Sequence, residues 1–147
     1  MCALAEAQQR LGVANHLLGR TYPMVNDAHI LLAVAKELHT AAFEGMNALL
    51  EYDKAAKRMP ALVKNVDGRL ELLEESLASH KLNPQFHKTI TQLHSIISLH
   101  ERAPVEFTKP DRFVICDKEY QLTTVTVDSV KQMLSQVRAF IDSISPI

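Results

Sequence analysis

The 147-residue sequence has no tryptophan, only four glycines and only two cysteines. The missing tryptophan and the low glycine content favour helices over a β-sandwich. Cys2 and Cys116 are too few and too far apart to predict a disulfide framework, and no Cys-x-x-Cys pair is available for zinc or redox chemistry. We therefore expect free thiols and an intracellular protein.

The sequence also lacks a large excess of charge of either sign and a long apolar run. The 16 Lys and Arg residues nearly balance the 17 Asp and Glu residues, and the formal net charge is −1. This balance produces no overall field that attracts nucleic acid or an anionic membrane. No run approaches the ~18 uncharged residues of a membrane helix, and Glu6 and Arg10 lie where a signal peptide would be apolar. We expect a cytoplasmic protein without a membrane partner, and a nucleic acid partner is not supported.

Most of the chain has apolar residues at alternating three- and four-residue steps, which is typical of amphipathic helices. Gly19 and Pro23 indicate a connector after the first helix, and Asn26 or Asp27 is expected to cap the second. Pro60 and the pair Asn83-Pro84 predict the next two helix starts. The predicted helices span residues 3–18, 27–58, 60–77, 84–103 and 126–144. Small residues in the second helix, at Ala41, Ala42 and Gly45, are expected to admit a close neighbour.

Residues 105–122 have the alternating β-branched and aromatic pattern of strands, at 105–108, 112–116 and 119–122. Turns are expected at residues 109–111 and at Asp117-Lys118. The predicted fold is mainly α, an antiparallel up-down bundle of four to five helices with a short β-hairpin or three-stranded meander before the last helix. We expect a single domain over 1–147. Because two or three strands are marginal alone, they must pack on the helices or pair with a second copy, which predicts a homodimer. We expect this dimer to form either by edge pairing of the strands or by docking of the small-residue face of the second helix.

Histidines on the fourth predicted helix are candidates for metal binding. His87, His94 and Glu101 recur every seven residues and therefore share one edge of the helix. Metal sites in bundles, however, use Glu-x-x-His pairs from several helices, and this sequence has none. The alternative is that these histidines lie at the boundary of the core. Glu37 and His39, two residues apart, lie on different helix faces and are expected at the surface or beside an interface.

A second candidate is the pair Arg10 and His16, whose Arg-x5-His spacing resembles the Arg-x4-6-His motif of HEPN domains. That resemblance implies an RNase or toxin–antitoxin component in which two motifs converge across a dimer. In the family the motif lies near the start of a late helix, whereas here it lies within the first helix.

A third candidate is the connector, where Arg20, Tyr22 and Asp27 precede a helix start that can hold an anion. The alternative is structural, with Tyr22 packed over the end of the bundle and Arg20 paired with Asp27.

Two stretches together, residues 21–27 and the strand residues 105–107, 112–115 and 120, resemble small archaeal proteins of unknown function. The resemblance covers most of the chain and implies a cytoplasmic archaeal protein with a hairpin inserted in a bundle. It brings no catalytic residues. We therefore expect a non-enzymatic, self-associating interaction module without a cofactor, with a possible further protein partner. The alternatives are a HEPN-like RNase and a metal-binding bundle.

Overall fold

The computed structural model describes residues 3–57 and 65–147. The helical segments are α1 (Ala3–His16), the π-helical turn η1 (Leu17–Thr21), α2 (Tyr22–Val25), α3 (His29–Ala55), α4 (Val66–Ser79), α5 (Gln85–Arg102) and α6 (Val127–Ile144). The strands are β1 (Val105–Lys109), β2 (Arg112–Cys116) and β3 (Leu122–Thr126). The predicted fold class is confirmed, since a small antiparallel sheet precedes the last helix of a mainly helical chain.

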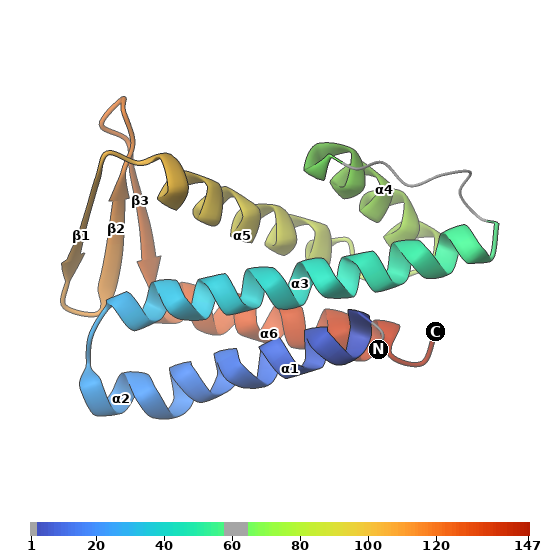
Figure 1. Cartoon of the computed structure of the whole chain (residues 1–147), viewed down its shortest axis with the longest axis horizontal. Helices are drawn as coiled ribbons and strands as arrows, with labels where there is room; N and C mark the ends of the chain where they lie inside the picture. The colour runs from blue at the N-terminus through green and yellow to red at the C-terminus, as the bar shows by residue number, and fades with distance from the viewer. Residues whose placement is uncertain (1–2, 58–64) are drawn as a thin grey trace.

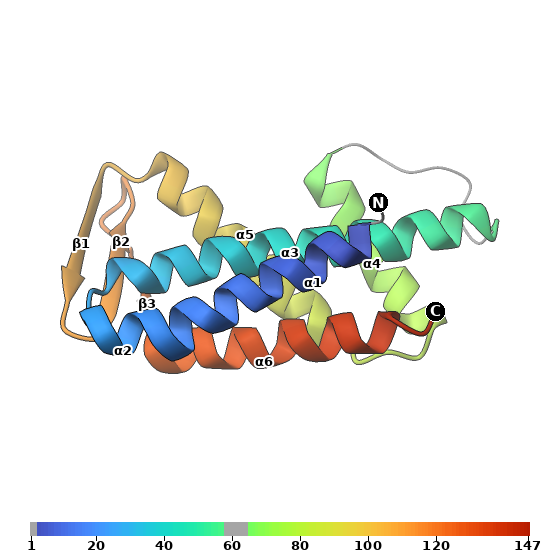
Figure 2. The same cartoon turned by 60° about the horizontal axis from the view of Figure 1, so that its bottom comes forward.

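Helix α3 is the centre of the bundle and contacts α1, α4, α5 and α6. In Figures 1 and 2, α1, α3 and α6 run along the length of the molecule, and the sheet stands across one end. Gly45 allows α6 to come close, because a Cβ atom built there would lie 3.1 Å from Cε2 of Phe140. The predicted close approach at the small residues of this helix is therefore confirmed. In the part of the chain that the structure describes, no helix is long and apolar enough to cross a membrane.

The sheet has the strand order β1-β2-β3, with antiparallel pairing throughout. Its inner face consists mainly of apolar side chains that join the helical core, at Phe113, Ile115 and Val125. Strands β2 and β3 contact α3, and β3 also contacts α6. The ring of His29, the first residue of α3, lies edge-on to Phe113 at a centroid distance of 5.6 Å. The core of the bundle thus continues to one face of the sheet and stops there.

The prediction of a connector between the first two helices is wrong. The backbone stays helical through Gly19 and Pro23. This helical segment ends at Asn26, whose φ is 53°. The N–H of Tyr22 donates to the carbonyl of Leu17 in the π turn, which widens the helix just before the proline that has no N–H. Packing of neighbouring apolar side chains against the core offsets the weak helix propensity of this segment.

The third strand also differs from its prediction, because it begins at Leu122, where the predicted strand ended. Asp117 accepts hydrogen bonds from the N–H groups of Glu119 and Gln121 at 2.8 and 3.0 Å, and Tyr120 has a left-handed φ of 62°. These bonds make a longer loop than the expected two-residue turn. Strands β1 and β2 were predicted correctly, apart from Lys109 at the end of β1.

The side chains of two predicted cap residues, Asp27 and Asn83, accept hydrogen bonds at helix starts, whereas the cap at Thr126 was not predicted. Asp27 accepts a hydrogen bond from the N–H of His29, and Asn83 accepts one from the N–H of Gln85, both at 2.9 Å. Helix α6 begins with a capping box formed with Thr126. The predicted helix start at Pro60 lies outside the described residues.

Candidate functional site

The outer face of the sheet, defined by Val105, Phe107, Val114 and Leu122, is apolar and faces away from the helices. Val105, Phe107 and Leu122 are 52%, 39% and 62% exposed, while Val114 between them is only 3% exposed. Val114 does not belong to the helical core cluster, so it is covered by its neighbours on this face. The loop that follows β2 adds Tyr120, which is 86% exposed. Exposed apolar residues grouped in this way mark interaction surfaces.

Strand β1 is an edge strand, since within residues 3–57 and 65–147 it pairs only with β2. The two-residue turn at Pro110 and Asp111 makes Lys109 and Arg112 a hydrogen-bonded pair. From that point, non-hydrogen-bonded and hydrogen-bonded residue pairs alternate along the two strands. The backbone N–H and C=O groups of Glu106 and Thr108 therefore point to the open side of β1. An open edge of this kind is a template for another strand.

The open strand is fixed in place from its inner face. Nδ1 of His100, in the last turn of α5, lies 2.6 Å from Oε2 of Glu106. Both side chains are about one quarter exposed. This contact ties β1 to the helical bundle across the short link at Ala103 and Pro104. The edge is therefore held in a defined orientation before any partner binds.

A pair of histidines lies between α3 and α5. Nε2 of His39 is 3.3 Å from Nδ1 of His94, and both side chains are half-buried. The ring of Phe43 stacks on His39 at a centroid distance of 4.4 Å. On the other side, Nε2 of His94 lies 3.4 Å from Oγ of Ser98. His39, expected at the surface or beside an interface, thus belongs to a polar contact between two helices.

Burial lowers the pKa of His39 from 6.5 to about 4. The neighbouring His94 lowers this pKa further, because two imidazolium rings repel each other, whereas the carboxylate of Glu101 raises it. His39 is therefore neutral at physiological pH. A neutral imidazole has one nitrogen lone pair that can accept a proton or bind a metal ion.

The three residues of the predicted metal site, His87, His94 and Glu101, do not meet at one site, because His94 and His87 contact different helices and Glu101 is exposed. His94 turns to His39 on α3, whereas Nδ1 of His87 lies 4.0 Å from a carboxylate oxygen of Glu74 on α4. Glu101 is exposed. Among residues 3–57 and 65–147, no group of three His, Cys, Asp or Glu side chains is arranged to hold a metal ion.

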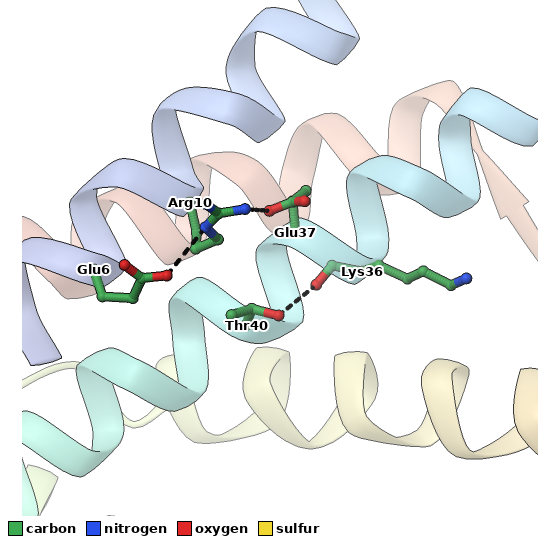
Figure 3. Close-up of polar contacts among 5 residues, drawn as sticks. All are labelled: Glu6, Arg10, Lys36, Glu37 and Thr40. Atoms are coloured by element: carbon green, nitrogen blue, oxygen red, sulfur yellow. Dashed lines mark hydrogen bonds and ion pairs between the residues drawn. The ribbon is translucent and has the colours of Figure 1, made fainter.

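Arg10 and His16 do not converge within one chain. Nη1 of Arg10 donates to Glu37 at 3.2 Å, and its Nε lies 3.3 Å from Glu6, so the guanidinium joins α1 to α3 (Figure 3). The side chain of Lys36, the residue before Glu37 on α3, extends away from the guanidinium of Arg10 in the same figure. His16 is exposed, and six residues of helix place it about 240° around α1 from Arg10.

The predicted anion site is also divided between elements. Arg20 and Tyr22 belong to the continuous helical segment, where Arg20 is exposed and Tyr22 is packed against the core. Asp27 instead interacts with His29, whose backbone N–H and ring nitrogen both lie 2.9 Å from its carboxylate. These hydrogen bonds lower the pKa of Asp27. The carboxylate therefore occupies the helix start that was considered for an anion.

A buried polar network at the other end of α3 was missed by sequence reasoning. Asp53 is 1% exposed, accepts a hydrogen bond from the hydroxyl of Ser76, and lies 2.7 Å from Nε2 of His80. The network joins α3 to α4. Only the four-residue spacing of Ser76 and His80 was visible in the sequence.

Comparison of the chain with protein-family models, with curated proteins and with solved structures found no match in any of the three. The resemblances to archaeal proteins and to HEPN domains therefore remain predictions. The features of the molecule that bear on its function are the outer face of the sheet, the open edge of β1 and the histidine pair.

Proposed function

We propose that this protein is a non-enzymatic interaction module that associates with a second copy of itself through β1 and the outer face of the sheet. The observation that supports this proposal is the apolar outer face beside an unpaired strand edge. A free edge and an apolar face at the same place favour β-sheet addition, in which backbone hydrogen bonds supply affinity and side chains supply specificity.

The sequence of β1 is compatible with pairing to its own copy. In an antiparallel pair centred on Phe107, the two Phe107 side chains meet at the two-fold axis. Glu106 then lies opposite Thr108 of the second copy, and their outward-pointing backbone groups can form the new hydrogen bonds. Val105 lies opposite Lys109, whose aliphatic stem can cover it. No two like charges face each other in this register.

The experiment compares the oligomeric state of the wild-type chain and of F107E by analytical ultracentrifugation from 1 to 100 μM, roughly the range in which weak dimers dissociate. We expect a wild-type dimer and a dissociation constant at least about tenfold higher for F107E, because two carboxylates would face each other at the two-fold axis. The matched control is I147E, which changes an exposed apolar residue at 39% exposure outside the sheet. It should leave the dimer intact.

Two results would contradict the proposal. One is a wild-type chain that stays monomeric over the whole concentration range. The other is a dimer that F107E and I147E weaken equally, since that would place the contact elsewhere. The HEPN-like alternative has a different requirement, namely that Arg10 leaves Glu6 and Glu37 to meet substrate, and no contact of Arg10 favours it.

A further inference from the structure

We propose that His39 and His94 bind a divalent transition metal ion of the zinc type between α3 and α5. This site differs from the set suggested by the sequence, because its second ligand comes from α3 and not from the same helix. It is independent of the proposed self-association, which concerns the sheet.

The distance between the two ring nitrogens fits one shared ion. Nitrogen ligands lie 2.0 to 2.1 Å from zinc, and two such ligands of a tetrahedral ion are about 3.3 to 3.4 Å apart. Nε2 of His39 and Nδ1 of His94 are separated by 3.3 Å. Each ring has to turn only enough to direct its lone pair at the ion in place of the other nitrogen.

The contact with Ser98 is compatible with the proton position that His94 requires. If Nε2–H of His94 donates to Oγ of Ser98, then Nδ1 of His94 has a free lone pair and accepts the proton of His39 Nε2. To bind a metal ion through Nε2, His39 takes its other neutral tautomer, in which the proton moves from Nε2 to Nδ1 and frees the Nε2 lone pair. The contact with Ser98 would then hold the ring of His94, as the second nitrogen of a metal-bound histidine is commonly held.

The surroundings leave room for a partly open site. Phe43 stacks on His39, and both histidines are half-buried, so part of their surface is accessible to water. The charge of Glu101 acts on His39 from the same edge of α5 as His94 and favours a cation there. With two protein ligands and water in the remaining positions, the site is expected to bind more weakly than a structural zinc site with four protein ligands.

The test is a titration of the metal-free, full-length chain with Zn²⁺ by calorimetry, and with Co²⁺ followed by visible absorption. We expect one ion per chain, with affinity reduced at least about tenfold in H39A and in H94A and about tenfold in S98A. H87A is the matched control, since His87 lies one heptad before His94 on the same helix but faces α4. It should bind as the wild type does.

A second measurement keeps the proposal testable if a histidine variant fails to fold. Zn²⁺ added to the wild-type chain should shift the imidazole NMR signals of His39 and His94 and leave those of His87 unchanged. The proposal is overturned if the wild type takes up no stoichiometric metal, if H39A and H94A bind as tightly as the wild type, or if the shifted signals belong to other histidines.

Discussion

Lowering the pH from 7 to 5 should destabilise the folded chain through His39. Its pKa falls from 6.5 to about 4 on folding, mainly because the ring is buried, so the unfolded chain binds a proton in this range and the folded chain does not. Stability is therefore lost as the pH falls below 6.5, and the loss levels off near pH 4. This is the sign expected of a histidine that is held neutral in the folded state.

The magnitude follows from the same two pKa values. For a shift from 6.5 to about 4, proton linkage gives a loss of about 2 kcal/mol between pH 7 and pH 5. Because solvent reaches part of the ring and screens its charge, we expect about 1 kcal/mol from this residue. Burial is the largest cause of the lowered pKa of His39; His94, across from it on α5, lowers the pKa further, and Glu101 opposes the shift.

The assay is urea unfolding of the wild type and of H39Q at pH 7, 6 and 5, followed by circular dichroism. The free energy of unfolding of the wild type should fall about 1 kcal/mol more than that of H39Q over this range. H16Q removes an exposed histidine and should retain the wild-type pH dependence. Equal pH dependence in the wild type and in H39Q would refute the argument that burial of His39 causes the loss.

Two further predictions concern stability. G45V should lower the free energy of unfolding by about 1 to 3 kcal/mol, because a Cβ at Gly45 already lies 3.1 Å from Phe140. In G45A the better helix propensity of alanine should offset this close contact. Urea unfolding of both variants tests this, and a G45V chain as stable as the wild type would contradict it. T126A should cost about 1 kcal/mol because it removes the N-cap of α6. The exposed neighbour variant T124A is its control, and an equal effect of both would show that the cap is not the cause.

The candidate sites were harder to predict than the fold, for a physical reason. The heptad spacing of His87, His94 and Glu101 places them on one edge of α5. Their contacts, however, depend on the helix that packs beside each position, which is α4 for His87 and α3 for His94. The distance from His94 to His39 depends on how α3 and α5 pack, and 55 residues separate the two histidines in sequence. The same holds for Arg10 and Glu37, 27 residues apart. No local pattern records such pairs.

The sequence by itself determined most of the helical segments, the position of the sheet and the helix starts at Asp27 and Asn83, because apolar periodicity and capping side chains act within a few positions of the chain. Only the tertiary structure decided where the first helix ends, since packing against the core outweighed Gly19 and Pro23. It also decided that one face of the sheet is buried and the other exposed. That difference arises because the helices cover one side of the sheet alone, and it locates the proposed interaction surface.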